Sequence, residues 1–125
     1  MNLSEAKNNR KLGKLGESLA ANYLQKRGFT IIERNFRVRY GEIDLVAKDA
    51  DTLVFVEVKT RMSTQFGLPE EAITPKKLHE IIKTLEMYAL RHHVQQMQLR
   101  IDAVAIQMNA DYTVRDIRHI ENIFS

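Results

Sequence analysis

The sequence predicts an α/β protein in which helices flank a mixed β-sheet. Three observations predict it. Two segments have the apolar spacing of amphipathic helices, five segments are rich in β-branched and aromatic residues, and short polar turns separate several of these strands. The predicted order is helix, three strands, helix, two strands, which fits one sheet with helices packed on it.

The first helix is predicted over residues 8–27, and Gly28 follows it. Glycine adopts the left-handed backbone conformation without steric cost, so it commonly ends helices. The apolar residues of this segment recur three or four positions apart, as on the buried side of a helix. This stripe comprises Leu12, Leu15, Gly16, Leu19, Ala20, Tyr23 and Leu24.

Three strands are predicted next, over residues 29–38, 42–48 and 52–60. The turns between them are short, at Tyr40-Gly41 and at residues 49–51, so the three strands should form an antiparallel meander. Residues 61–72 have no clear period and are predicted to be a loop.

The second helix is predicted to begin after Thr74, with threonine as the N-cap and Pro75 in the first turn. Its apolar stripe runs to the histidines at 92 and 93, where the helix should end. Two more strands are predicted over residues 99–108 and 112–120, with a turn at residues 109–111.

Length and composition indicate a single domain over residues 1–125 in the cytoplasm. The chain is 44% hydrophobic and 28% charged, an ordinary balance for a globular protein. It contains no cysteine, which excludes disulfides and thiolate zinc sites. The polar N-terminal residues predict no signal peptide, and no run of about 20 apolar residues predicts a membrane helix.

The formal net charge is +3, and its distribution is uneven. This excess fits either a polyanionic partner or an ordinary solvated surface. The basic residues cluster in three places: Lys7, Arg10, Lys11 and Lys14; Arg34, Arg37 and Arg39; and Lys76 and Lys77.

Charged residues interrupt two strands that are otherwise apolar. Alternation places Glu57 and Lys59 on one face of the third strand, together with Leu53 and Phe55. In the second strand it places Glu42, Asp44 and Val46 on one face and Ile43, Leu45 and Ala47 on the other. An exposed ion pair beside a polar hairpin would explain isolated charges of this kind.

Their position inside the apolar run VFVEVKT favours a functional site instead, because burying an ionised carboxylate costs several kcal/mol unless it is paired or binds a metal. Two carboxylates and a backbone carbonyl suit Mg²⁺, and a nearby ammonium can orient water or stabilise negative charge. This combination is what hydrolysis of a phosphodiester requires.

At these residues the sequence resembles the PD-(D/E)XK, or restriction-endonuclease-like, nucleases. The matching runs are GEIDLVA and VFVEVKTR. Over most of its length the chain is more specifically similar to the small YraN-type family, whose members are taken to be endonucleases. The further segments that carry this similarity are GKLGESLAANYLQKRGF, FGLPEEAITPKK, LRIDAVAI and IRHIENIF.

The resemblance implies that Asp44 and Glu57 are metal ligands, with the carbonyl of Val58 as a third, and that Lys59 is the catalytic lysine. The proline that precedes the aspartate in the motif is absent, which leaves open whether Glu42 binds metal or pairs with a basic residue. Glu17 matches a first-helix glutamate that reaches the metal in Holliday-junction resolvases of this fold. A surface glutamate is the alternative for Glu17.

Four basic residues are candidates for nucleic-acid binding: Arg39, Arg61, Lys76 and Lys77. The two lysines open the second helix, where phosphate groups bind well. Exposed lysines without a ligand explain them equally well, and Arg61 has a site carboxylate as an alternative partner.

Several other side chains have a structural and a functional interpretation. Arg100 and Asp102 share a strand face, where an ion pair supporting the sheet is expected. His119 is expected to be a structural histidine. Phe36, Tyr40 and Phe66 flank basic residues, so they either stack on bases or pack within the protein.

The sequence therefore predicts a metal-dependent endodeoxyribonuclease that uses Mg²⁺, with Mn²⁺ as a substitute. Its resemblance suggests branched or structured DNA as substrate, in repair or recombination. Symmetric cleavage would need a homodimer. The alternative is a non-catalytic or partner-dependent binding module that acts with a helicase or recombination protein. The residues alone do not distinguish DNA from RNA.

Overall fold

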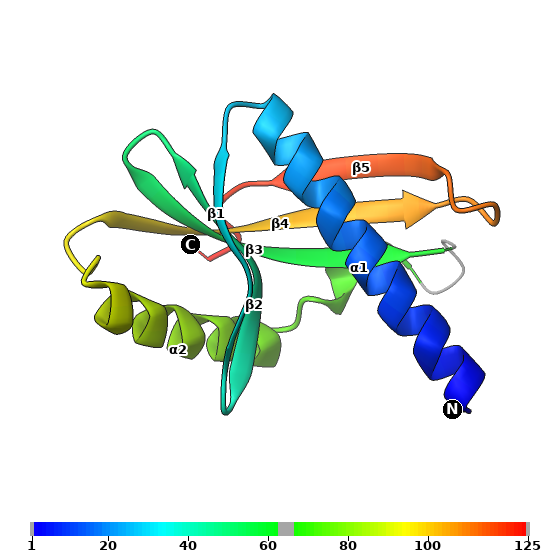
Figure 1. Ribbon diagram of the computed structural model, residues 1–125, viewed down its shortest axis with the longest axis horizontal. Coiled ribbons are helices and arrows are strands. Elements are labelled where there is room, and N and C mark those ends of the chain that lie inside the picture. The colour runs from blue at the N-terminus through cyan, green and yellow to red at the C-terminus, as the bar shows by residue number, and fades with distance from the viewer. Residues whose placement is uncertain (1, 63–66, 125) are drawn as a thin grey trace.

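The computed structural model describes residues 2–62 and 67–124, and its elements follow the predicted order (Figure 1). The helices and strands are α1 (Leu3–Lys26), β1 (Thr30–Val38), β2 (Gly41–Asp49), β3 (Thr52–Arg61), the one-turn 3₁₀ helix η1 (Pro69–Ala72), α2 (Pro75–His92), β4 (Gln98–Met108) and β5 (Val114–Ile120). η1 lies within the segment that was expected to be irregular throughout, which corrects that prediction.

Helix α1 begins five residues earlier than predicted. The side chain of Asn2 caps it by accepting a hydrogen bond of 2.9 Å from the backbone N–H of Glu5. The first turns are polar and exposed, so apolar periodicity could not reveal them. The C-terminal prediction is confirmed, because Gly28 has a φ of +96° directly after the helix.

Helix α2 begins where the sequence predicts. The hydroxyl of Thr74 accepts a hydrogen bond of 3.1 Å from the backbone N–H of Lys77, and Pro75 occupies the first turn. The helix ends at His93, which has a φ of 55°. This cap fixes the start of α2 and therefore the position of Lys77.

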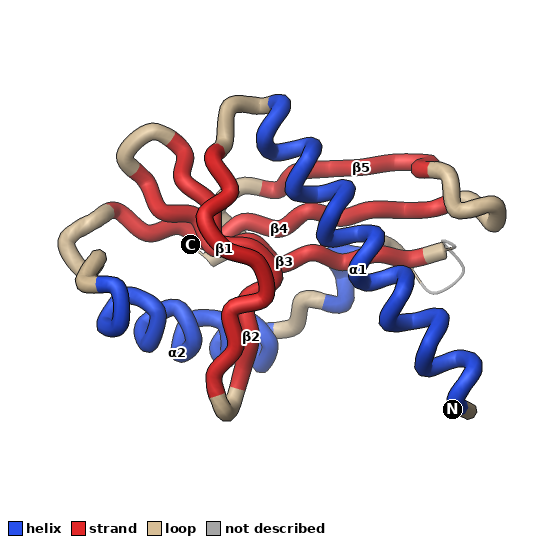
Figure 2. The backbone as a smooth tube through the Cα atoms, viewed as in Figure 1, coloured by secondary structure: helices blue, strands red, loops and turns tan. Residues whose placement is uncertain are grey.

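The described strands form one five-stranded sheet in the order β1-β2-β3-β4-β5 (Figure 2). β3 and β4 are parallel and the other neighbouring pairs are antiparallel, so the predicted meander of the first three strands is confirmed. Two parallel neighbours require a crossover, and α2 lies within it.

The two helices bury opposite faces of the sheet. Helix α1 packs Ala20, Ala21 and Leu24 against a cluster that includes Val56 and Val104. Helix α2 packs Ile81, Leu85 and Tyr88 against a second cluster that includes Phe55 and Ile101. The alternation of β3, with Val54, Val56 and Val58 on one face and Leu53 and Phe55 on the other, separates these cores.

The β1–β2 hairpin curls away from the rest of the sheet, and its turn lies beside α2 (Figure 2). At Gly41 a Cβ atom would lie 2.4 Å from the hydroxyl of Thr84 in α2, so only glycine fits this approach. Ile43 packs in the α2 cluster, whereas Leu45 lies in the α1 cluster. The prediction that both residues share one face is wrong, because the strong curl of β2 rotates its first residues relative to its last.

No helix in the described part of the chain is long and apolar enough to cross a membrane.

Candidate active site

The candidate site lies where β2 separates from β3. The two strands pair from Asp49↔Thr52 as far as Leu45↔Val56, and the pairing stops there. Asp44 and Glu57 are the next residues on each strand, so continuation of the register would have placed them opposite each other. The two carboxylates therefore stand at the fork of the sheet.

At this fork the side chain of Asp44 takes the place of a backbone hydrogen-bond acceptor. Its Oδ2 atom accepts a hydrogen bond of 2.8 Å from the backbone N–H of Val58, and the side chain is buried. An unpaired N–H at the same buried position would cost about 1–3 kcal/mol. The aspartate thus holds the separated end of β3 in place through one of its two carboxylate oxygens.

The carbonyl of Val58 points toward the same open edge of β3. In a strand, the N–H and C=O of one residue project to the same side. Because the N–H of Val58 faces Asp44, its carbonyl also lies on the side that β2 has left. A backbone oxygen therefore faces the same edge of β3 as Asp44.

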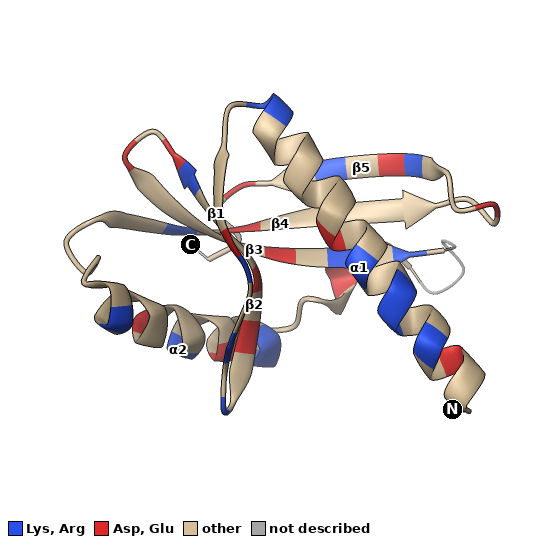
Figure 3. Ribbon diagram, in the orientation of Figure 1, with Lys and Arg blue, Asp and Glu red and all other residues tan. Residues whose placement is uncertain are grey.

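Glu57 is 4% exposed and lies between two lysines. Its Oε1 atom is 3.4 Å from Nζ of Lys59, on the same strand, and 3.8 Å from Nζ of Lys77 in α2. Lys77 was expected only to bind phosphate, so its contact with a site carboxylate is an addition from the structure. Figure 3 shows this charged segment of β3 between α1 and the start of α2.

The carboxyl groups of the site hold their protons more tightly than usual. Burial, and then the charge of Asp44, raise the pKa of Glu57 from 4.5 to about 7. Burial also raises the pKa of Asp44, against the lowering effect of the Val58 hydrogen bond. The two lysines offset only part of this cost, so the site favours an additional positive charge.

Glu17 faces the fork from α1. Its pKa is raised, first by burial and then by the negative charge of Asp44, while a side-chain hydrogen bond with Asn35 lowers it. The structure thus brings Glu17 into the electrostatic environment of the predicted site. Asn35 was not predicted; it lies in β1 with a φ of 54°, between the residues that pair with Ile43 and Leu45.

The donor atoms at the fork suit a hard divalent cation. Among the described residues, no three carboxylate or imidazole groups lie close enough together to hold a metal ion. The arrangement consists instead of two buried carboxylates, a backbone carbonyl edge and Glu17 farther out. Oxygen donors with room for several waters match the preference of Mg²⁺.

Glu42 lies beside this set: its Oε2 accepts a hydrogen bond of 3.1 Å from the guanidinium of Arg37, and its negative charge helps to raise the pKa of Asp44 and of Glu17. The pairing with a basic residue that the sequence offered as one alternative is therefore present. The pair is largely exposed, so it contributes little to stability.

The residues predicted to bind nucleic acid are spread around the fork. Lys76 and Arg39 are exposed, and Arg39 lies over the ring of Tyr40 at 5.3 Å. Arg61 follows the site on β3 and donates to the carbonyl of Thr60 at 3.1 Å. Within the part of the chain that the structure describes, no ion pair joins Arg61 to a site carboxylate.

A groove of about 560 Å³ adjoins the fork. It is lined by Asn9, Leu12, Gly13 and Glu17 of α1 and by residues 58–62 at the end of β3. Glu17 and Lys59 thus connect the groove to the carboxylates, although Asp44 and Glu57 do not line it themselves.

A second buried charge network lies on the α1 face of the sheet. The guanidinium of Arg100 pairs with Asp102 at 2.8 Å, which confirms the predicted ion pair. The same carboxylate contacts Nε2 of His119 at 2.8 Å and accepts from the backbone N–H of Asn122 at 3.0 Å. These contacts join β4, β5 and the C-terminal segment, as expected of structural residues.

The three aromatic candidates for base stacking differ in their surroundings. Phe36 is buried and packs edge-to-face on Tyr88 at 5.0 Å, which confirms packing within the protein, one of the two alternatives that the sequence left open for it. The curl of the hairpin turns this side chain into the α2 core. Tyr40 is 80% exposed and available for contacts, and Phe66 lies outside the described residues.

Comparison with known proteins places the chain in a family. Residues 16–106 match the model described as "Uncharacterised protein family UPF0102". A UPF0102 protein of Caldicellulosiruptor saccharolyticus is 44% identical over 94% of this chain and 99% of its own length. A UPF0102 protein of Syntrophomonas wolfei is 47% identical over 93% of this chain and 99% of its own length. A UPF0102 protein of Geotalea daltonii is 45% identical over 96% of this chain and 94% of its own length. The chain belongs to the UPF0102 family.

Proposed function

We propose that this chain is a metal-dependent endonuclease that hydrolyses phosphodiester bonds in DNA. The observation that carries the proposal is the pair of buried carboxylates, Asp44 and Glu57, at the point where two strands separate. A sheet gains no stability from two adjacent buried carboxylates, since burial and mutual repulsion both oppose their ionisation. A site for a divalent cation accounts for both.

In this proposal Asp44, Glu57 and the carbonyl of Val58 hold Mg²⁺ or Mn²⁺, and Glu17 contributes from the side of α1. Such a cation supplies charge neutralisation at the phosphate and acidifies water. Asp44 is fixed in position by its hydrogen bond from Val58, which aligns β3 with the fork. A ligand on a rigid strand holds its geometry better than one on a loop.

The lysines then have separate roles. Lys59, two residues from Glu57 on the same strand, is placed to orient the attacking water and to stabilise the negative charge that grows on the phosphate. Lys77 projects from the first turn of α2 and neutralises part of the charge of Glu57. Its ammonium also offers the phosphate a second contact, from α2.

The finer parts of the proposal concern substrate and assembly. The resemblance to resolvases suggests branched or otherwise structured DNA, with a role in repair or recombination. A homodimer would supply two sites for symmetric cleavage. A helicase or recombination protein is the kind of partner that would present such a substrate.

Cleavage of defined substrates tests the proposal. Labelled single-stranded, duplex, flap and four-way-junction DNA, together with RNA, would be incubated with the native chain and Mg²⁺ or Mn²⁺. The variants would be Asp44→Asn, which keeps an acceptor for Val58, and Lys59→Gln. Lys48→Gln is the matched control, because Lys48 is exposed at the far end of β2.

Metal-dependent cleavage that is lost in Asp44→Asn and Lys59→Gln, and kept in Lys48→Gln, is the expected result. Absence of cleavage of every substrate, with binding that the two site variants do not change, would contradict it. That outcome would favour a binding module that acts only with a partner.

A further inference from the structure

The N-terminal half of α1 extends beyond the part of the helix that packs on the sheet (Figure 1). Leu3 is 81% exposed, and the first buried residue of the helix is Gly16. Packing of an apolar face supplies most of the stability of helices in proteins. The first turns of α1 lack most of that support. They carry several exposed basic side chains, and packing on the sheet accounts for neither these turns nor their charge.

Two of these basic residues lie on the side of α1 that faces the site. Arg10 and Lys14 precede Glu17 by seven and three residues, and these spacings place all three on one side of a helix. Glu17 in turn faces the carboxylate of Asp44. Both basic side chains are exposed, and the structure records no ion pair for either of them among the residues it describes.

The groove beside the site runs along this same part of α1. Gly13 and Glu17 line it, and Arg10 and Lys14 lie about two turns and one turn before Glu17, toward its side of the helix. Its other wall is the end of β3, where Lys59 and Arg61 add positive charge. Part of its lining is apolar, which suits sugars and bases, while the basic residues border it where phosphates would lie.

We propose that the N-terminal half of α1 is a nucleic-acid-binding arm. Arg10 and Lys14 contact phosphates of the substrate strand, and this strand occupies the groove on its way to the carboxylates. The inference rests on the proposed function, since it assigns a strand path to the same site. It adds residues that neither the sequence motif nor the family resemblance singled out.

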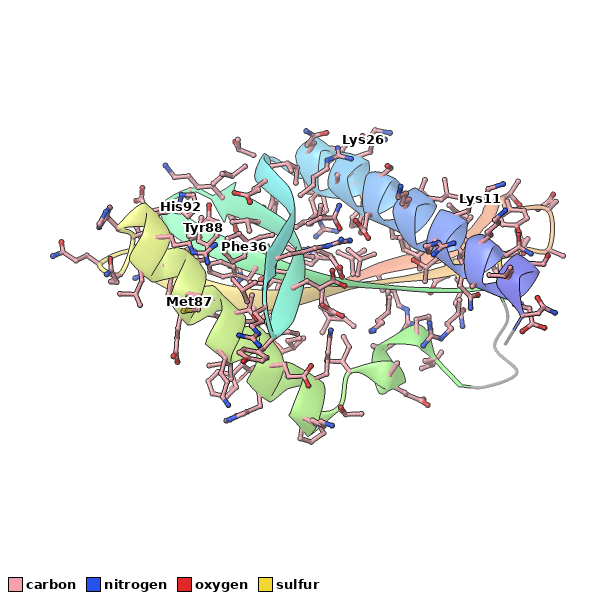
Figure 4. All side chains as sticks on the ribbon, turned by 60° about the horizontal axis from the view of Figure 1, so that its bottom comes forward. Lys11, Lys26, Phe36, Met87, Tyr88 and His92 are labelled. Carbon is pink, nitrogen blue, oxygen red and sulfur yellow. The ribbon has the colours of Figure 1, made fainter. Side chains whose placement is uncertain are left out.

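The same helix provides a matched control. Lys11 and Lys26 are exposed lysines of α1 that both point from the side of the helix facing away from α2 (Figure 4). At about 100° per residue, Lys11 lies about 120° around the helix from Glu17, whereas Arg10 lies within about 20° of Glu17 and Lys14 within about 60°. Neutralising these two lysines changes the net charge by as much as neutralising Arg10 and Lys14.

The test measures binding separately from cleavage. A labelled single-stranded DNA and its duplex would be titrated with the full chain in EDTA, over a range of salt concentrations, using fluorescence anisotropy. The compared proteins are native, Arg10→Gln/Lys14→Gln and Lys11→Gln/Lys26→Gln. Glutamine keeps the helix propensity of these positions, and circular dichroism would verify that each variant is helical.

The expected result is weaker binding by Arg10→Gln/Lys14→Gln alone. Its slope of log K against log salt should be smaller in magnitude by about 1.4 on single strands and about 1.8 on duplex, for two lost phosphate contacts. The control variant should keep the native slope. Equal loss in both variants, no loss in either, or no binding by the native chain would overturn the proposal.

Cleavage assays keep this inference separate from the nuclease proposal. If the native chain cuts no substrate and only Arg10→Gln/Lys14→Gln binds DNA more weakly, the arm proposal stands and the nuclease proposal fails. If the native chain cuts DNA and the two double variants bind it equally well, the nuclease proposal stands and the arm proposal fails.

Discussion

Replacing Glu57 with glutamine should remove a large part of the pH dependence of the chain's stability above pH 4.5. Burial and Asp44 raise the pKa of Glu57 from 4.5 to about 7, so the folded state binds this proton more tightly than the unfolded state. Its contribution to the free energy of unfolding is fully present below pH 4.5 and is lost as pH rises through about 7. A separation of about 2.5 pKa units corresponds to about 3 kcal/mol.

Urea unfolding between pH 4.5 and 8.5 in EDTA measures this effect. Across this range the free energy of unfolding of Glu57→Gln should rise by about 3 kcal/mol relative to that of the native chain. Glu86→Gln is the control, because Glu86 is exposed on α2 and its replacement should leave a curve parallel to the native one. Parallel curves for the native chain and Glu57→Gln would refute the reasoning.

Three further predictions concern packing, the second charge network and metal binding. Gly16→Ala should cost about 1–3 kcal/mol in urea unfolding, since a Cβ would lie 1.9 Å from the hydroxyl of Thr60; native stability would contradict this close approach. Asp102→Ala should cost about 3–5 kcal/mol, because it removes the buried carboxylate shared by Arg100, His119 and the N–H of Asn122 and leaves Arg100, among the described residues, only its 3.4 Å pair with Asp49; a loss below about 1 kcal/mol would contradict this. Mn²⁺ at about 100 times its Kd should stabilise the native chain by about 2.7 kcal/mol in thermal unfolding, and equal stabilisation of Asp44→Asn would argue against the metal site.

Local signals in the sequence were sufficient for the order and most boundaries of the elements. Thr74 and Pro75 fix the start of α2 through a hydrogen bond and a backbone preference that involve only neighbouring residues. Gly28 ends α1 for a similarly local reason. The start of α1 was missed because its first turns bury little, so no apolar pattern marks them.

The positions of side chains at the fork depend on longer-range geometry. Strict alternation predicted that Ile43 and Leu45 share a face, but the curl of the hairpin separates them into different cores. The contact of Lys77 with Glu57 depends on how α2 docks, and Asn35 reaches Glu17 from a backbone conformation with positive φ. Asparagine tolerates that conformation better than most residues, which is the only sequence signal it offered.

Asp44 combines a structural and a chemical role, and two substitutions separate them. Asp44→Asn keeps an oxygen that accepts from the N–H of Val58, whereas Asp44→Ala removes it. In urea unfolding at pH 8 the alanine variant should be less stable than the asparagine variant by about 1–3 kcal/mol, the cost of an unpaired buried donor. Both should lose metal binding equally, because neither carries the charge. If both variants proved equally stable, the Val58 contact would not organise the fork, and the case for a prearranged ligand at this position would fail.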